Sequence, residues 1–262
     1  MISTGEQVSG LFGVAGKGVA ITGGGSGIGQ ALGIAFASAG AKVALLDVNQ
    51  KNLDESLALY AKSGLPASGA RCDVTDPAGV ERAFAEAGGR LGRLDVLVNC
   101  AGITLWKPAE EHTTEEFRRV IEINLTGTFN CCQAAGRRMI PGGGGKIVNV
   151  SSIRGFVGLP NGIAAYASSK GGINMLTRQL ATEWGKHRIN VNAIAPGMIR
   201  TPLSAFFVDS EVGRNYYLPR IMLGRCGETD DLVGTVLFLA SRASDYVTGQ
   251  IIAIDGGMLA AG

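Results

Sequence analysis

Short apolar runs rich in β-branched residues alternate with helix-like stretches through almost the whole of this chain. The strand-like runs lie at residues 18–22, 42–47, 67–72, 95–99, 146–151, 190–195 and 250–255. Runs that are apolar on both sides are typical of parallel strands covered by helices on each face. The alternation therefore predicts an α/β fold with a doubly wound, seven-stranded parallel sheet.

The chain of 262 residues suits one domain built on a single sheet. We predict that this domain spans residues 17–262 and that residues 1–16 form an N-terminal extension. The longest helical patterns run over residues 113–139 and 165–186, and Thr113 with Glu116 predicts a capping box at the start of the first. Residues 201–224 break the alternation and contain four aromatic residues, which suits a mobile segment that closes over a substrate.

Charge and composition exclude several classes of protein. The net charge is +2 and the basic residues are scattered, so a nucleic-acid partner is not expected. No stretch approaches the roughly 18 consecutive apolar residues of a membrane span, and no leader pattern is present, so we expect a cytoplasmic protein without a membrane partner. Five cysteines without CxxC spacing and only two histidines predict neither a disulfide framework nor a metal site.

A glycine-rich turn follows the first predicted strand and leads into a helical stretch. Its sequence runs from Thr22 to Gly29, and the helix-like residues begin at Gln30. Glycines at 23, 27 and 29 let the backbone approach phosphate groups closely, while the free N–H groups of the helix start can bind them. The order of strand, turn and helix predicts a dinucleotide site in a Rossmann-like fold, and a glycine turn without a ligand is the alternative.

The second predicted strand ends in a carboxylate. Asp47 lies eighteen residues after Gly29, close to the spacing of about 20 at which dinucleotide-binding folds place the acid that bonds the adenosine ribose. No arginine immediately follows Asp47 to neutralise a 2′-phosphate. The pattern therefore favours NAD over NADP, and a simple helix cap at Asp47 is the alternative.

Tyr166 and Lys170 stand four residues apart in a helical stretch, which places them on one helix face. A free phenol has a pKa of about 10, so a tyrosine that acts as a base near neutrality needs a cation beside it. Lys170 can supply that charge. Taken alone, such a pair is usually explained by packing and solvent contacts.

Several short motifs occur in the order that is typical of the short-chain dehydrogenase/reductase family, and the chain resembles this family from about residue 17 to residue 257. The motifs are the glycine turn of residues 22–29, Asp73-Val74, Asn99-Cys100-Ala101-Gly102, Asn124, Ser152, Tyr166 with Lys170, Pro196-Gly197 and Thr201. Cys100 replaces the asparagine that the family usually has there. The resemblance implies an oxidoreductase that moves a hydride between nicotinamide and a secondary alcohol or its ketone.

The resemblance also implies roles for individual residues. Tyr166 would exchange a proton with the substrate oxygen, Lys170 would lower the pKa of Tyr166 and bind the nicotinamide ribose, and Ser152 would hold the substrate oxygen. Asn124 would bend its helix and position a water in a proton relay to Lys170. The implied cofactor-binding residues are Gly23, Ser26, Gly27, Ile28, Gly29, Asp47, Asp73, Val74, Asn99, Ala101, Gly102, Tyr166, Lys170, Pro196, Gly197, Ile199 and Thr201.

Two serines compete for the catalytic role. We choose Ser152 because the family places its serine before two variable residues and a glycine, here Ser152-Ile-Arg-Gly155, and we expect Ser151 to be structural. Residues near the catalytic segments are candidate substrate contacts. They are Ser152, Arg154, Phe156, Tyr166, Met198 and Leu203, with Thr104, Trp106 and Phe207 beside them. Arg154 could pair with an anionic substrate, although a solvated surface charge is the slightly favoured interpretation.

Within the family, the sequence around Tyr166 and the segment from Ala181 to Gly185 most resemble dehydrogenases of sugar acids and polyols, such as gluconate 5-dehydrogenases. A reductase of 3-oxoacyl thioesters on acyl carrier protein is one alternative, but such enzymes normally prefer NADPH. A non-catalytic dinucleotide-binding module is another. The family usually forms tetramers, so we expect a homotetramer through residues 113–139, 165–186 and 250–257.

Overall fold

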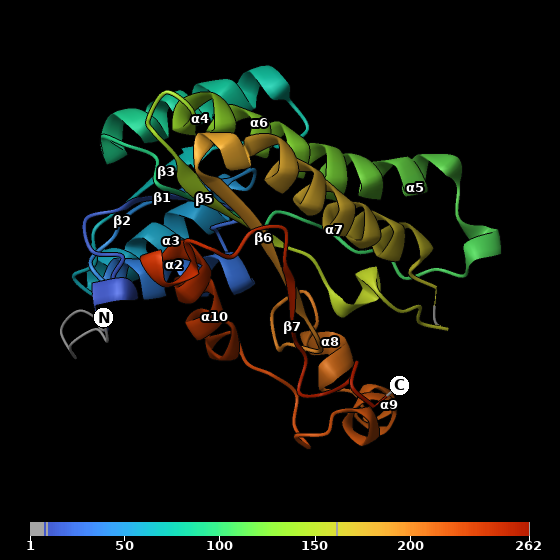
Figure 1. Cartoon of the computed structure of the whole chain (residues 1–262). Helices are drawn as coiled ribbons and strands as arrows, with labels where there is room; N and C mark the ends of the chain where they lie inside the picture. Colours follow the sequence, from blue (N-terminus) through green and yellow to red (C-terminus); the bar gives the residue numbers. More distant parts are fainter. Residues whose placement is uncertain (1–7, 9, 161, 262) are drawn as a thin grey trace.

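A computed structural model describes residue 8, residues 10–160 and residues 162–261 of the chain, and its centre is one parallel sheet. The sheet has seven strands in the order β3-β2-β1-β4-β5-β6-β7, all parallel (Figure 1). The strands are β1 (Gly18–Thr22), β2 (Lys42–Asp47), β3 (Ala67–Arg71), β4 (Val96–Asn99), β5 (Gly145–Val150), β6 (Ile189–Pro196) and β7 (Ile251–Ile254). The predicted doubly wound fold is confirmed.

Helices cover both faces of the sheet because the strand residues that point to each face are apolar. Ala20 and Leu97 pack with α4, α6 and α7, whereas their neighbours Val19, Ile21 and Val98 pack with α2, α3 and α10 (Figure 1). The helices are α2 (Gly27–Ser38), α3 (Gln50–Lys62), α4 (Pro77–Leu91), α5 (Thr114–Ile121), α6 (Gly127–Met139), α7 (Ala164–Trp184), α8 (Ala205–Val208), α9 (Glu211–Tyr217) and α10 (Asp230–Ala240).

The predicted helix of residues 113–139 contains a π-helical turn. Its capping box is present: Glu116 N donates to Thr113 Oγ1 at 3.1 Å, and Thr113 N donates to Glu116 Oε2 at 2.9 Å. The turn Glu122–Thr126 then joins α5 to α6 without ending the helix. Such turns often occur at functional sites, and this one contains the fully buried Asn124.

Part of the predicted N-terminal extension packs onto the domain. Val14 lies in the same core as α2 and α10, and Gly16 N donates to Gly40 O at 2.8 Å. The Phe12 ring lies 6.4 Å from the Phe238 ring, centroid to centroid. Residues 1–7 and residue 9 of that extension are outside the described part of the chain.

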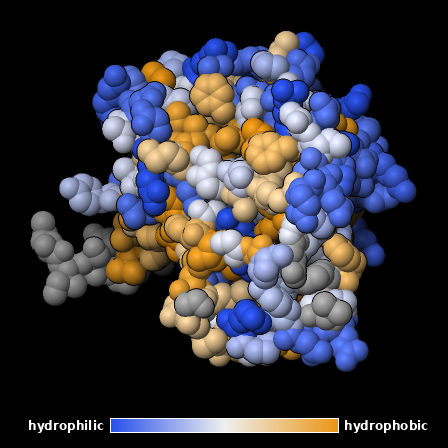
Figure 2. Space-filling view, turned by 90° about the vertical axis from the view of Figure 1, so that its right-hand side faces the viewer, coloured by the Kyte–Doolittle hydropathy of each residue, from blue (hydrophilic) through white to orange (hydrophobic). Residues whose placement is uncertain are grey.

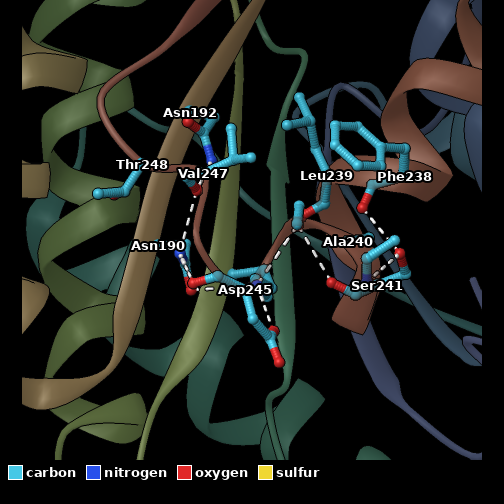
Figure 3. Close-up of polar contacts among 12 residues, drawn as sticks. Asn190, Asn192, Phe238, Leu239, Ala240, Ser241, Asp245, Val247 and Thr248 are labelled. Carbon is cyan, nitrogen blue, oxygen red and sulfur yellow. Dashed lines mark hydrogen bonds and ion pairs between the residues drawn. The ribbon is translucent and has the colours of Figure 1, made fainter. Parts of the chain in front are cut away.

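A polar network fixes the connection between α10 and β7 (Figure 3). Asn190 on β6 donates through Nδ2 to the backbone oxygens of Asp245 and Val247, both at 3.0 Å. Asn192 donates to Val247 O at 2.9 Å. These bonds satisfy carbonyl groups of an irregular segment, so β7 is held beside β6.

The predicted substrate segment of residues 201–224 is largely helical. It contains α8, α9 and the 3₁₀ turn Leu218–Arg220, and it lies beyond the carboxyl end of β6 (Figure 1). No helix in the described residues has the length and apolar character needed to cross a membrane.

Candidate active site

Two adjoining cavities lie at the carboxyl edge of the sheet, near β1 and β4, where the strand order reverses. Ligands of doubly wound folds bind at this topological switch point. We call them the cofactor cleft, lined from Gly23 through Asp47 to Asp73, and the catalytic cavity, lined by Ser152, Tyr166 and Lys170. Five residues line both: Ile28, Cys100, Gly102, Thr201 and Leu203. Figure 2 shows apolar side chains gathered across the middle of the face turned toward the viewer.

The glycine turn has the geometry of a phosphate cradle. Gly23 and Gly27 adopt φ values of +65° and +54°, which L side chains rarely adopt. A Cβ on Gly29 would lie 2.2 Å from Gly23 O, so only glycine permits this close approach. The first N–H groups of α2 have no intrahelical partner, as at any helix start. The Ser26 side chain, which precedes the helix, does not cap them, so they stay available for a ligand. The turn therefore fits the pyrophosphate of a dinucleotide.

Asp47 lies at the end of β2 and lines the cofactor cleft. Its Oδ2 accepts from Gly25 N and its Oδ1 from Asn49 N, both at 2.9 Å. The carboxylate thus ties the glycine turn to β2, and each oxygen retains acceptor capacity for a ribose hydroxyl. The sheet register also places Arg71 opposite Asp47, and Arg71 Nε donates to Val48 O at 3.2 Å. Inspection of the residues next to Asp47 in sequence missed this cation.

Most of the other predicted cofactor residues line the two cavities. Ser26, Ile28, Val74, Ala101 and Gly102 line the cleft, and Pro196, Gly197 and Ile199 line the catalytic cavity. Asp73 also lines the cleft, and its Oδ1 accepts from Thr75 N at 2.9 Å and Thr75 Oγ1 at 2.7 Å. Thr201 Oγ1 lies 3.1 Å from Ser204 Oγ.

Asn99 has a different environment from the other predicted cofactor residues. It is buried, is not among the residues that line either cavity, and donates through Nδ2 to Asn149 Oδ1 at 2.9 Å. The same Nδ2 lies 3.3 Å from Cys132 Sγ. The side chain therefore joins β4, β5 and α6 beneath the cleft.

Ser152, Tyr166 and Lys170 converge on the catalytic cavity from two elements. Ser152 follows β5, and the other two lie one turn apart on α7. Ser151 also lines the cavity, but its Oγ donates to Asn174 Oδ1 at 2.6 Å and contacts Lys170 O at 3.2 Å. These bonds support the structural role predicted for Ser151.

The Asn124 side chain connects three segments around the site. Its Oδ1 accepts from Ile103 N at 2.8 Å, and its Nδ2 donates to Ile103 O at 2.9 Å and Ser169 Oγ at 3.0 Å. All of these partners are protein atoms, so the side chain itself is committed to holding the loop after β4 against α7. Any water relay at this residue would use its backbone.

Lys170 is a buried ammonium group that forms no salt bridge with an Asp or Glu among the described residues. Its Nζ donates to Val150 O at 2.7 Å and lies 5.5 Å from the centroid of the Tyr166 ring. Burial lowers the pKa of Lys170 from 10.5 to about 8. The group can therefore change charge close to neutral pH.

The Tyr166 phenol is influenced by its burial and by three nearby side chains, Ser152, Arg154 and Tyr217. Burial raises the pKa of Tyr166, while a hydrogen bond with Ser152 and the positive charge of Arg154 act to lower it. Lys170 was expected to supply the cation that acts on this phenol. That role stays a prediction: Lys170 Nζ donates to Val150 O and lies 5.5 Å from the centroid of the Tyr166 ring, and Arg154 is a further positive charge that acts on the phenol.

The substrate contacts predicted from proximity in sequence are partly found at the cavity. Arg154, Met198 and Leu203 line it, as do Thr104 and Trp106. Phe156 is not among the lining residues and is 45% exposed, because it follows the 3₁₀ turn Ile153–Gly155 on the outer side. The Phe207 side chain lies outside the described part of the structure.

The sequence did not single out the most buried aromatic residue that the segment 201–224 contributes to the catalytic cavity. Tyr217 lines the cavity, is 3% exposed and lies under the Arg154 guanidinium, whose carbon is 5.8 Å from the ring centroid. Its signal in the sequence was only membership of an aromatic-rich segment. Phe206, from the same segment, also lines the cavity.

Lys170→Met is expected to change how stability depends on pH. The folded pKa of about 8 lies below the unfolded value of 10.5, so the unfolded chain binds more protons and wild-type stability gains with pH across this window. Below pH 8 the buried charge costs up to about 3 kcal/mol, since each pKa unit corresponds to about 1.4 kcal/mol. The Met variant should therefore be more stable than wild type at pH 7, with an advantage that shrinks toward pH 10.5.

Urea unfolding of both proteins at several pH values measures this difference. Lys62→Met removes an exposed lysine and controls for the loss of one positive charge. A stability difference between Lys170→Met and wild type that stays constant over the window would contradict the charge assignment.

Comparisons with known proteins show relatives over nearly the whole chain. Residues 23–259 match the profile of a family described as enoyl-(acyl carrier protein) reductase. The gluconate 5-dehydrogenase of Gluconobacter oxydans (strain 621H) is 38% identical over 248 residues, which cover 95% of this chain and 96% of that protein.

Two solved structures show the same fold over nearly the full length. A short-chain type dehydrogenase/reductase from Mycobacterium marinum has a TM-score of 0.91 at 38% identity and covers 96% of this chain and 98% of that chain. A gluconate 5-dehydrogenase from Burkholderia cenocepacia J2315, in complex with NADP and tartrate, has a TM-score of 0.92 at 36% identity. That match covers 97% of this chain and 100% of the other. With these relatives and the converging Ser152, Tyr166 and Lys170, the chain belongs to the short-chain dehydrogenase/reductase family of oxidoreductases.

Proposed function

We propose that this protein is an NAD-dependent oxidoreductase that interconverts a secondary alcohol and a ketone on a small sugar acid or polyol. The observation that carries the proposal is the convergence of Ser152, Tyr166 and Lys170 on a cavity that adjoins the cofactor cleft. When bound, NAD supplies the hydride acceptor for alcohol oxidation. The protein's residues must then bind the alcohol and remove its hydroxyl proton.

Tyr166 and Ser152 are suited to handle that proton. In oxidation, the Tyr166 oxygen takes the proton from the substrate hydroxyl, and in reduction it returns the proton to the forming alkoxide. The Ser152 hydroxyl, which interacts with the Tyr166 phenol, holds the substrate oxygen beside it. Because burial raises the pKa of Tyr166, this base works best in oxidation at alkaline pH and as an acid in reduction at lower pH.

Lys170 and Asn124 support this proton exchange without contacting the substrate. The Lys170 ammonium borders the cavity next to Gly102, where it is placed to bind the nicotinamide ribose. A β-carbon on Gly102 would lie 3.9 Å from Lys170 Nζ and 3.2 Å from Asn124 Oδ1. Asn124 fixes the loop after β4 against α7, and we propose that the backbone of its π turn binds a relay water.

Asp47 supports NAD as the preferred cofactor, since its carboxylate lines the cleft where an adenosine ribose would lie. A 2′-phosphate there would face a like charge. The Burkholderia relative was solved in complex with NADP, so a protein with this fold and 36% identity binds the phosphorylated cofactor. Arg71 is the nearby cation that could reduce the repulsion, although it is not among the residues that line the cleft.

The size of the catalytic cavity supports a small substrate. Its volume is about 180 Å³, smaller than the roughly 300–1,000 Å³ of typical drug-sized ligand sites. Apolar side chains such as Trp106, Ile163 and Leu203 form much of its wall. A long acyl thioester, the substrate of the alternative 3-oxoacyl reductase function, would have to extend out of the cavity.

A kinetic screen tests the proposed function. Gluconate, polyols, hydroxysulfonates, hydroxy esters and sterols would be offered with NAD and with NADP, and acetoacetyl thioesters with NADH and NADPH, while absorbance reports the cofactor's redox state. We expect the highest kcat/KM with NAD and a small polyhydroxylated substrate. A strong preference for acetoacetyl or longer thioesters with NADPH would support the alternative reductase, and no turnover of any substrate would favour a non-catalytic binding module.

We also propose a homotetramer, because the helices that the family uses for assembly carry exposed apolar side chains. A groove between the α5–α6 helix and α7 is lined by Leu125, Phe129, Met175 and Leu176. Phe129 and Met175 are 40% and 56% exposed. Light scattering should give the mass of four 27.0 kDa chains, and a monomer at micromolar concentration would count against the assembly.

A further inference from the structure

Arg154 presents an uncompensated positive charge to the catalytic cavity. It follows Ser152 by two residues, is half-buried and lines the cavity. Its Nη1 donates to Gly158 O at 3.0 Å, which holds the guanidinium group at one edge. A guanidinium has five N–H donors in a planar fork, so most of its donors remain for a second partner.

Arg154 lacks the carboxylate partner that several other arginines have, and among the described arginines without a salt bridge it is the one that lines the catalytic cavity. Arg137 and Arg138 share Glu81, and Arg225 pairs with Asp231. No salt bridge involves Arg154 among the described residues. The lining of the catalytic cavity, as far as the structure describes it, also contains no Asp or Glu, whereas it contains Arg154 and Lys170. The cavity therefore favours an anionic occupant.

Tyr217 supplies a second polar group beside Arg154. The guanidinium carbon lies 5.8 Å from the Tyr217 ring centroid, and the phenol oxygen forms a hydrogen bond with Arg154. Burial raises the pKa of Tyr217, so its hydroxyl stays protonated and can donate. Because Tyr217 lies on α9, an anion bound here would contact both the segment of the catalytic serine and the substrate segment.

Arg154 is also close enough to the reaction centre to influence it, because its charge acts to lower the pKa of Tyr166. A group bound by Arg154 would thus lie in the same small cavity as the substrate oxygen. Lys170 also lines this cavity, but its Nζ already donates to Val150 O at 2.7 Å and offers no planar fork of donors. A planar carboxylate matches the guanidinium fork by accepting two parallel N–H bonds.

We propose that Arg154 and Tyr217 form the carboxylate subsite of this enzyme, which makes its preferred substrate the anion of a small hydroxy acid rather than a neutral polyol. The inference rests on the proposed oxidoreductase function and narrows its substrate class. Binding of the carboxylate fixes the carbinol carbon against Ser152 and Tyr166. It also draws α9 onto the substrate, since Tyr217 contributes to the same subsite.

The first test compares an acid with its uncharged amide. Arg154→Met should raise KM for gluconate about 10- to 100-fold, as expected for losing a charge-assisted hydrogen-bond pair. Loss of the Arg154 charge also acts on Tyr166 and lowers turnover of both substrates alike, so the diagnostic result is a loss of kcat/KM that is at least about tenfold larger for gluconate than for gluconamide. Arg154→Lys, which retains the charge but not the fork, should recover part of the loss.

Arg220→Met is the matched control. Arg220 lies over the neighbouring Tyr216 ring at 4.1 Å in the same segment, but it does not line the cavity. Its loss should leave the kinetics with both substrates unchanged. Equal losses with gluconate and gluconamide in Arg154→Met would overturn the proposal, since they would show that Arg154 acts through Tyr166 or through folding.

The second test does not depend on turnover. Tartrate, a small dicarboxylate, is titrated calorimetrically into the enzyme saturated with NADH. We expect binding to wild type and to Arg220→Met, and affinity at least about tenfold weaker in Arg154→Met. If gluconate is not oxidised but tartrate binding depends on Arg154, the sugar-acid substrate is wrong and the carboxylate subsite stands. If wild type does not bind tartrate, or if Arg154→Met binds it equally well, the subsite is wrong.

Discussion

Tyr166→Phe is expected to lower turnover by at least about 10²-fold and up to 10⁴-fold, because general acid–base groups contribute that much to a rate. The change removes the hydroxyl that exchanges a proton with the substrate and keeps the ring that fills the site. Lys170 still donates to Val150 O, and the glycine turn is not touched. NADH binding, measured by fluorescence titration, should therefore remain nearly unchanged while kcat collapses in both directions.

Tyr246→Phe is a suitable control because it also removes a phenol hydroxyl. Tyr246 is wholly exposed and is not among the described residues that line either cavity. It should retain full turnover. If Tyr166→Phe kept more than about a tenth of the wild-type rate, Tyr166 would not be the principal acid–base group. Ser152 would then be the next candidate.

Asp47 is expected to set cofactor preference, with wild type using NAD over NADP by roughly a hundredfold or more in kcat/KM. The carboxylate can accept hydrogen bonds from both adenosine ribose hydroxyls, whereas a 2′-phosphate would bring a second negative charge. Asp47→Ala should therefore weaken NAD use and relieve the repulsion toward NADP. Efficient NADP use is not expected, because Ala supplies no cation, Val48 and Asn49 offer none, and Arg71 is not among the residues that line the cleft.

The structure adds a control to this experiment. Asp47 Oδ2 also accepts from Gly25 N, so removing the side chain loosens the glycine turn for both cofactors. Asp47→Asn keeps an acceptor oxygen for Gly25 while removing the charge, and it should shift the NAD/NADP ratio with a smaller loss of total activity. Equal wild-type efficiency with both cofactors, or an unchanged ratio in both variants, would show that Asp47 does not bind the ribose.

The fold was predictable because its signals are local. Each buried parallel strand is a short apolar run. No end of an observed strand differs from its predicted run by more than one residue. The Thr113 capping box was also readable, since its two bonds join residues three apart. The π turn at Asn124 was not, because its extra residue is stabilised by Ile103 and Ser169, which are far away in sequence.

The residues around the site also divide into those that local motifs predicted and those whose position depends on packing. Gly23, Gly29, Ser152 and Tyr166 could be assigned from motif order, because the chemistry fixes their spacing along one chain segment. Phe156 was placed at the substrate from its closeness to Ser152 alone, and the local turn directs it outward. Tyr217 was not selected, because its approach to Arg154 depends on how α9 packs over the cavity.

The amino-acid sequence by itself determined the parallel sheet and the glycine turn, and it predicted the residues that exchange a proton with the substrate oxygen. Each of these features depends on neighbours within a few positions. Only the tertiary structure decided which charges act on which groups. It brought the Lys170 ammonium to Val150 O beside the Tyr166 ring, and it brought the Arg154 guanidinium close enough for its charge to act on the same phenol. Electrostatic effects depend on distance and burial, and folding brings together charges whose separation along the chain says little about either.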